Sequence, residues 1–314
     1  MPIFKIDGSK LTLIKESRVD LEKYLQTLTE KNLQTIFGLE FVSGSLNNEF
    51  CVKGAQQDFY IDTLAFDPEA KSFVIIEYKK DKAFSVIDQG YAYLGAMLNN
   101  QADFVLEYNE KKKANLKKSD IDWRQSKIIF ISPQFTVYQQ SAIAFKDLPI
   151  ELWKVSLYEN NTILYEQVKP PVARESIGTI APKSKIIEQV SKEIKPYTLE
   201  EIFRRRKTSP RMKDLLNKLR EEIPRFGEDI KEAFGKWSVI YRKQGKTFAY
   251  LHPRTNEIHG DLRINEIKTS TKIGFKRKVK EEDEYKIAFK IRSEDQLNDA
   301  LNLIKEAYEN LAFG

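Results

Sequence analysis

Apolar residues in the first half of the chain change between helical and strand spacing. Residues 18–37 repeat Leu and Ile three to five positions apart, which predicts a helix. Residues 59–66 and 73–79 are rich in β-branched and aromatic side chains and flank a turn-like segment at 67–71, which predicts a hairpin. The same criteria predict one more helix and three more strands: 85–98 with Ser85 as N-cap, then 104–108, 127–131 and 150–158. This alternation is typical of an α/β domain with a mixed central sheet.

The second half of the chain follows a different order. Residues 169–196 contain several Pro, Ser and Lys residues and predict a linker. Helices are then expected before a group of strands and a closing helix, which is the order of a separate, smaller α+β domain. The expected helices are 199–203, 212–219 and 223–234, the strands 237–241, 248–251, 258–264 and 285–291, and the last helix 293–308. The predicted organisation is therefore a first domain at 1–168, a linker at 169–196 and a second domain at 197–314.

Composition narrows the class of protein. Of 314 residues, 41% are hydrophobic and 31% are charged, which supports folded cores rather than a disordered chain. No stretch reaches the roughly 18 apolar residues of a membrane span, and the first ten residues lack the order of a signal peptide, so we expect a cytoplasmic protein with no membrane partner. One Cys and two His leave carboxylates as the ligands for any metal.

The net charge of +6 is unevenly distributed. Residues 1–168 contain 20 Lys and Arg against 23 Asp and Glu, whereas residues 169–314 contain 32 against 23. A basic second half favours a polyanionic partner, although surface charge also varies without function.

The predicted hairpin brings two acids together. With a four-residue loop, Asp67 pairs with Ser72, and the same register places Asp62 opposite Glu77. Facing carboxylates repel each other, and a shared hard cation such as Mg²⁺ or Mn²⁺ would relieve the repulsion. Strand alternation points Lys79 to the same face as Glu77. Such a set suits phosphodiester hydrolysis, and the alternative is a group of edge-strand charges facing solvent.

Further polar residues match a known pattern. Gln89 and Tyr93 lie four apart on the next predicted helix and therefore share a face. Asp62, fourteen intervening residues and then Glu77-Tyr78-Lys79 resemble the signature of the PD-(D/E)XK nuclease superfamily. The Gln89-to-Tyr93 spacing is similar to its RecB-type Gln-x-x-x-Tyr element, and a preceding helix that bears Glu22 resembles the order in NucS-like, tRNA-endonuclease-like members. The Gly-Arg step expected before the Asp in the closest NucS-like members is absent.

The resemblance implies a role for each residue. Asp62, Glu77 and Glu22 would hold Mg²⁺ or Mn²⁺, and Lys79 would orient water and neutralise developing charge. Glu16 and Glu30 lie on or near the same helix and are alternatives to Glu22. Gln89 and Tyr93 would support the catalytic site or the nucleic-acid backbone. The resemblance thus implies a restriction-endonuclease-like α/β fold for the first domain.

Two basic runs in the second domain are candidates for contact with nucleic acid. The first comprises Arg204, Arg205, Arg206 and Lys207, and the second comprises Lys276, Arg277 and Lys278. Either run would suit phosphates, and either would also suit a solvated surface. This domain resembles an uncharacterised domain found in proteins labelled "predicted transport protein".

The sequence therefore favours a Mg²⁺- or Mn²⁺-dependent nuclease, with DNA a better substrate than RNA and with a homodimer as one compatible assembly. Repair of DNA and defence against foreign DNA are both compatible settings. The alternative is a non-catalytic module that binds nucleic acid or protein on a nuclease-like fold.

Overall fold

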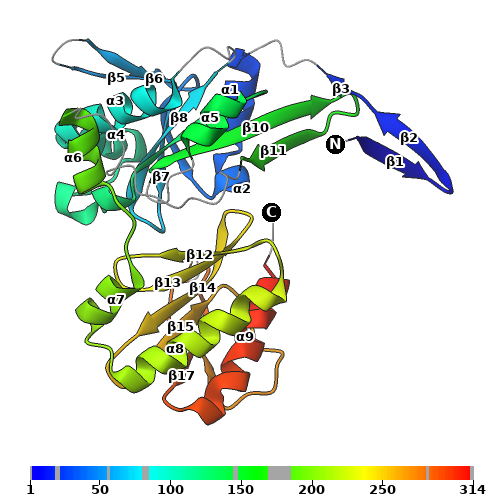
Figure 1. The fold of residues 1–314 in the computed structure, drawn as a ribbon, viewed down its shortest axis with the longest axis vertical. Coiled ribbons are helices and arrows are strands. Elements are labelled where there is room, and N and C mark those ends of the chain that lie inside the picture. The colour runs from blue at the N-terminus through cyan, green and yellow to red at the C-terminus, as the bar shows by residue number, and fades with distance from the viewer. Residues whose placement is uncertain are drawn as a thin grey trace. The chain divides into compact units, whose positions relative to one another are not determined.

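A computed structural model describes residues 2–17, 22–54, 57–79, 85–143, 148–168, 185–280 and 283–311. It divides into two compact units, Met1–Lys195 and Pro196–Gly314 (Figure 1). No helix among these residues is long and apolar enough to cross a membrane.

The first unit is built on a mixed seven-stranded sheet. Its strands run in the order β11-β10-β9-β8-β7-β4, and β3 pairs with β10. The β8–β9 and β9–β10 pairs are parallel and the other pairs are antiparallel. The strand bounds are β3 (Glu16–Ser17), β4 (Glu40–Gly44), β7 (Thr63–Asp67), β8 (Ser72–Tyr78), β9 (Lys127–Ser132), β10 (Ile150–Tyr158) and β11 (Ile163–Gln167). The α/β class with a mixed central sheet is as the sequence predicts.

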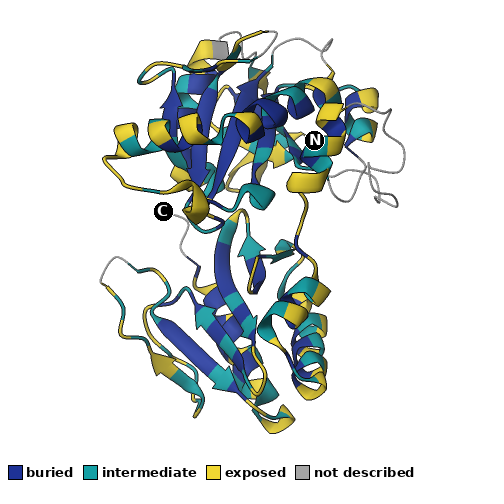
Figure 2. Cartoon of the chain, turned by 90° about the vertical axis from the view of Figure 1, so that its left-hand side faces the viewer, coloured by how far each residue is buried: buried dark blue, intermediate teal, exposed yellow. Residues whose placement is uncertain are grey.

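Two groups of helices bury the two faces of this sheet. Leu25 of α1 (Glu22–Lys31) and Leu33 of α2 (Leu33–Phe37) pack in one apolar cluster with Ile76 and Tyr78 of β8. The other face packs on α3 (Val86–Asn99), α4 (Gln101–Lys112) and α6 (Lys185–Glu193). A short helix, α5 (Val137–Ala142), follows β9. Figure 2 shows the strands as the buried layer between helices with exposed outer surfaces.

Two expectations for the first unit are wrong, and one of its elements was not predicted. Residues 104–108, predicted as a strand, lie inside α4, because Phe104, Val105 and Tyr108 share one helical face against the core. The predicted linker contains α6, whose Ile187 and Val190 join the core of the first unit.

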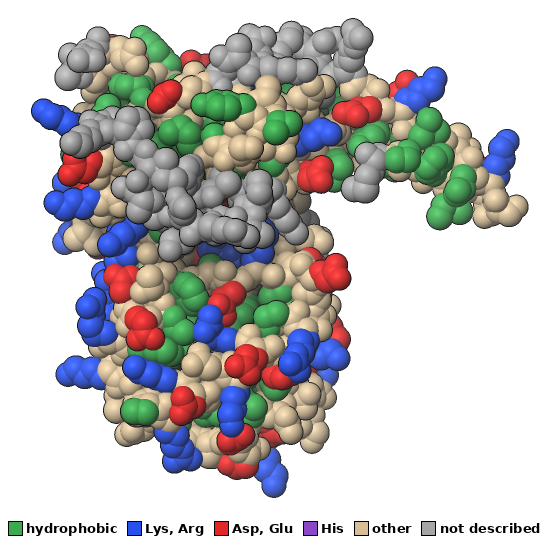
Figure 3. Space-filling view, in the orientation of Figure 1, with side chains coloured by type: hydrophobic (Ala, Val, Ile, Leu, Met, Phe, Trp, Pro, Cys, Tyr) green, Lys and Arg blue, Asp and Glu red, His purple; other side chains and the backbone are tan. Residues whose placement is uncertain are grey.

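The element that was not predicted is a hairpin of β1 (Ile3–Asp7) and β2 (Lys10–Ile14). It exposes apolar side chains, which Figure 3 shows on the projecting strands. A smaller hairpin joins β5 (Phe50–Val52) to β6 (Phe59–Ile61).

The second unit is an antiparallel sheet with helices packed on one face. The strand order is β12-β13-β14-β15-β17-β16, and α8 and α9 lie side by side against the sheet. Residues 223–234, predicted as one helix, instead form a single 3₁₀ turn and then β12, because Pro224 and Gly227 interrupt the helical pattern. The elements are α7 (Leu199–Arg206), α8 (Pro210–Glu222), β12 (Ile230–Phe234), β13 (Val239–Lys243), β14 (Lys246–Pro253), β15 (Ile258–Leu262), β16 (Gly274–Lys276), β17 (Ile287–Ile291) and α9 (Leu297–Glu309).

Candidate functional site

The β7–β8 hairpin has the register that the sequence predicts. Asp67 pairs with Ser72, and the ladder ends where Thr63 pairs with Ile76. Asp62 occupies the break between β6 and β7, one position beyond the ladder and level with Glu77. Asp62 therefore approaches Glu77 just beyond the last residue pair of the β7–β8 ladder, not within the ladder.

Asp62 and Glu77 contact each other through the backbone. The amide of Asp62 donates a hydrogen bond to Oε1 of Glu77 at 3.3 Å, and Oδ2 of Asp62 accepts one from the amide of Tyr78 at 2.9 Å. Glu77 is only 1% exposed. Burial, and then the neighbouring charge of Asp62, raise the pKa of Glu77 to about 7. The pair is thus a buried acid beside a second carboxylate that is half-buried.

Lys79 lies on the same side as Glu77. Its Nζ is 3.1 Å from Oε2 of Glu77, and this cation lowers the pKa of the carboxyl against the larger effect of burial. The Lys79 side chain remains 24% exposed, so the ion pair opens to solvent at the lysine end. Tyr78 points the other way and is buried in the cluster with Leu25 and Leu33, as strand alternation requires.

Helix α3 contributes two more of the predicted residues. Ser85 accepts a hydrogen bond from the amide of Asp88 and caps the helix as expected. The hydroxyl of Tyr93 donates to the carbonyl of Tyr60 at 3.1 Å. Burial, followed by the charges of Glu77 and Asp62, raises the pKa of Tyr93, which places its ring beside the acids.

Gln89 lies one helical turn before Tyr93. Its Oε1 is buried and accepts no hydrogen bond from the described residues. A buried acceptor without a donor costs about 1–3 kcal/mol.

Helix α1 supports the site from the other side through Gln26, which sequence reasoning missed, and through Glu30, which it gave as an alternative to Glu22. Nε2 of Gln26 donates to the carbonyl of Asp62 at 2.7 Å and to Oε1 of Glu30 at 3.0 Å. Glu30 is 3% exposed and also accepts a hydrogen bond from Thr63 at 2.7 Å. The signal that could have identified Gln26 is the four-residue spacing of Gln26 and Glu30 on one helical face. Glu22 is the first residue of α1, and its side chain lies outside the described residues.

The chemistry of Asp62 and Glu77 fits a hard divalent cation. Two carboxylates without nitrogen or sulfur ligands suit Mg²⁺ or Mn²⁺, and a cation would offset the repulsion that raises the pKa of Glu77. The pair supplies two protein ligands. Within the described part of the chain, no cluster of three or more His, Cys, Asp or Glu side chains is arranged to hold a metal.

The first predicted basic run ends helix α7. Arg205 lies over the ring of Tyr197, with its guanidinium 4.8 Å from the ring centroid, and pairs with Glu201. Arg206 donates to the carbonyl of Trp237 at 3.0 Å. The run also contains the exposed residues Arg204 and Lys207.

The second basic run lies at and beyond the end of β16. Arg277 is anchored to Asp261 and to the carbonyl of Tyr285, at 3.3 and 2.8 Å. Lys276 and Lys278 are exposed.

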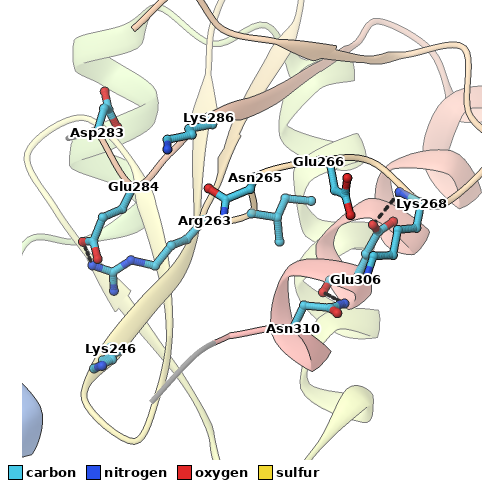
Figure 4. Close-up of a pocket in the computed structure, with 11 residues that line it drawn as sticks. Lys246, Arg263, Asn265, Glu266, Lys268, Asp283, Glu284, Lys286, Glu306 and Asn310 are labelled. Atoms are coloured by element: carbon cyan, nitrogen blue, oxygen red, sulfur yellow. Dashed lines mark hydrogen bonds and ion pairs between the residues drawn. The ribbon is translucent and has the colours of Figure 1, made fainter. Parts of the chain in front are cut away.

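A cavity of about 320 Å³ in the second unit is balanced in charge. Four cationic and four acidic side chains line it, and Arg263 pairs with Glu284 across it (Figure 4). The carboxylate of Glu306 accepts hydrogen bonds from the amides of Lys268 and Thr269 at 2.7 and 3.0 Å. Because cationic and acidic side chains are equal in number, this cavity shows no excess of either that would select an ionic ligand.

Comparison with known proteins adds relatives without an assigned activity. Residues 199–310, which form most of the second unit, match the family described as a domain of unknown function, DUF5655. An uncharacterised protein of Haemophilus influenzae is 43% identical over 197 residues, which are 63% of this chain and 63% of that protein. No solved structure matches the chain.

Proposed function

We propose that the first unit is a metal-dependent nuclease of the PD-(D/E)XK kind that hydrolyses phosphodiester bonds, with DNA as the favoured substrate. The observation that carries this proposal is the convergence of Asp62, Glu77 and Lys79 at the end of the β7–β8 ladder. Glu77 is almost fully buried there, and its pKa is raised to about 7. Perturbed acids beside a lysine are typical of catalytic sites.

Each residue has a distinct proposed role. Asp62 and Glu77 would hold Mg²⁺ or Mn²⁺, which supplies an activated water and neutralises charge on the phosphate. Glu22, at the start of α1, would complete the ligand set. Lys79 would leave the carboxylate of Glu77 and donate to a non-bridging phosphate oxygen, where its charge stabilises the transition state.

Gln89 and Tyr93 would act on the substrate side of the site. The Oε1 of Gln89, which has no donor among the described residues, would take a hydrogen bond from bound water or from a nucleotide. The ring of Tyr93 would limit solvent access to Glu77, and its hydroxyl would keep the carbonyl of Tyr60 in place. These roles require no movement of the sheet.

The basic second unit would hold the polyanion. Residues 196–314 contain 26 Lys and Arg against 20 Asp and Glu, whereas residues 1–195 contain 26 of each. Cations that neutralise phosphates release counterions and thereby supply most of the sequence-independent affinity for nucleic acid.

One observation favours the competing function of a non-catalytic nucleic-acid or protein module. The acids are satisfied by protein groups, since Glu77 pairs with Lys79 and Asp62 accepts the amide of Tyr78. Incubating the full chain with labelled DNA and Mg²⁺ or Mn²⁺ decides between the two. Cleavage that is lost in Asp62→Asn and in Glu77→Gln supports the nuclease, whereas binding without cleavage at any metal concentration supports the module.

A further inference from the structure

Alternate residues of β14 and β15 point to opposite faces of the second unit's sheet. Leu251 and Leu262 enter the core that contains residues of α8 and α9. Their strand neighbours His252, His259 and Asp261 therefore project from the opposite face. These three side chains are 15–19% exposed, so the cluster is only partly accessible to solvent.

The two histidines of the chain meet on one carboxylate. His252 and His259 are directly paired across β14 and β15. Nε2 of His252 lies 3.0 Å from Oδ2 of Asp261, and Nε2 of His259 lies 3.1 Å from Oδ1. Burial opposes ionisation of Asp261, but these hydrogen bonds hold the pKa of the carboxyl below its ordinary value. Arg277 adds a fourth group, with Nε 3.3 Å from Oδ1.

Aromatic and cationic side chains extend this cluster in both directions. Nη2 of Arg206 is 3.5 Å from Nδ1 of His252, and the same guanidinium lies 5.2 Å from the centroid of the Trp237 ring. On the other side, the ring of Phe275 lies 6.2 Å from that of His259. We call Trp237, Arg206, His252, His259, Phe275 and Arg277 the aromatic–cationic row. Its outer rings are the most accessible, with Trp237 44% and Phe275 40% exposed.

The row joins two basic runs that are far apart in the sequence. Arg206 belongs to the run that ends α7, and Arg277 belongs to the run that follows β16. Both guanidiniums contact the His252–Asp261–His259 cluster from different elements. The fold therefore places one arginine from each of the two basic runs at one site, between exposed rings.

The geometry argues against two other uses of the histidines. The two Nε2 atoms face different oxygens of Asp261, and Arg277 occupies the same carboxylate, so the cluster is hydrogen-bonded rather than arranged around a metal. Nδ1 of His259 is buried, and Nδ1 of His252 faces Arg206. Since neither free ring nitrogen faces solvent, acid–base catalysis there is also disfavoured.

We propose that the aromatic–cationic row binds single-stranded nucleic acid, with bases stacked on Trp237 and Phe275 and phosphates held by Arg206 and Arg277. This inference rests on the proposed function only for the choice of nucleic acid as the polyanion. Exposed rings with cations between them form a stacking platform, which requires bases that are not already stacked in a duplex. The hydrogen bonds between Asp261 and the two imidazoles would keep the row rigid.

The test measures binding by the full chain in chelator, so that no cleavage occurs. The probes are a labelled oligothymidylate of about 16 nucleotides, at the upper end of known site sizes, and a duplex of the same length. Phe275→Ala should weaken oligothymidylate binding about 10-fold through loss of one stacked base, and Phe275→Tyr should restore it. Arg206→Gln should also weaken binding.

Two control variants match these changes outside the row. Leu106→Ala shortens an exposed apolar side chain of α4, and Lys305→Gln removes a cation from α9. Both should bind as the unmodified chain does. The proposal is overturned if Phe275→Ala and Arg206→Gln bind normally, if the controls lose as much affinity, or if the duplex binds as tightly as the single strand. Oligothymidylate binding by a full chain that does not cleave DNA once Mg²⁺ or Mn²⁺ replaces the chelator would instead contradict the proposed nuclease alone.

Discussion

The amide of Asp62 donates to Oε1 of Glu77 at 3.3 Å, while the carboxylate of Asp62 accepts from the amide that follows Glu77. The two contacts fix both acids where the β7–β8 ladder ends. Helix α1 adds a third constraint, because Gln26 binds the carbonyl of Asp62. Backbone contacts therefore set the position of both acids.

Replacing Glu77 by Gln should stabilise the metal-free protein at pH 8. The raised pKa of Glu77 means that the native state holds a proton more tightly than the unfolded chain does, so stability falls as pH rises from about 4.5 towards 7. At about 1.4 kcal/mol per pH unit, ionisation costs on the order of 3 kcal/mol. Urea unfolding in chelator should show a gain for Glu77→Gln at pH 8 and little change at pH 4.5. If Glu77→Gln lowers the free energy of unfolding equally at both pH values, the pKa of Glu77 is not raised.

Replacing Lys79 by Ala should separate metal binding from catalysis. The lysine pairs with Glu77 at 3.1 Å and lowers the pKa of that carboxyl, so its removal should move the pH midpoint of Mn²⁺ binding upward. Calorimetry should still detect binding at pH 8, while cleavage should fall by about 100-fold, the scale of one lost electrostatic contact. Lys79→Arg serves as the charge-conserving control. Undiminished cleavage by Lys79→Ala would exclude a catalytic role for this residue.

Replacing Gln89 by Met should raise stability and lower activity. The side chains are similar in length, and Met removes a buried acceptor that has no donor among the described residues. The free energy of unfolding should increase by about 1 kcal/mol, while cleavage decreases. If Gln89→Met is destabilised and fully active, the amide serves packing rather than substrate.

Neutralising Arg204, Arg205 and Arg206 together should flatten the salt dependence of nucleic-acid binding. Each lost phosphate contact should reduce the slope of log K against log salt by about 0.9 on duplex DNA and about 0.7 on a single strand. Mn²⁺ binding at Asp62 and Glu77 should be unchanged. An unchanged slope in the triple variant would place the affinity elsewhere.

Much of the local structure was accessible from the sequence. The hairpin register, the Ser85 cap and strands β9 and β10 are confirmed, because each depends on short-range pattern and turn chemistry. The strand expected at 104–108 is wrong. An apolar run of that length fits the spacing of a strand and of a helix equally well, and packing against the sheet selects the helix.

The parts of both sites that escaped prediction depend on long-range contacts. Gln26 reaches Asp62 from another element, and Asp261 meets His252 only after β14 and β15 pair. Sequence spacing was enough to predict that Asp62, Glu77 and Lys79 lie close together, because all three lie in or directly beside one hairpin. It could not show that Arg206 and Arg277 contact one cluster, since the intervening strands determine that.

The central claim is that Asp62 and Glu77 form a metal site that cleaves nucleic acid. The most direct measurement is cleavage of labelled DNA by the purified full chain in Mg²⁺ or Mn²⁺, compared with Asp62→Asn, Glu77→Gln and the double variant. We predict metal-dependent cleavage that chelator abolishes and that each single variant reduces to background. Metal-independent cleavage that persists in the double variant, or none by the unmodified chain in either metal, would contradict it.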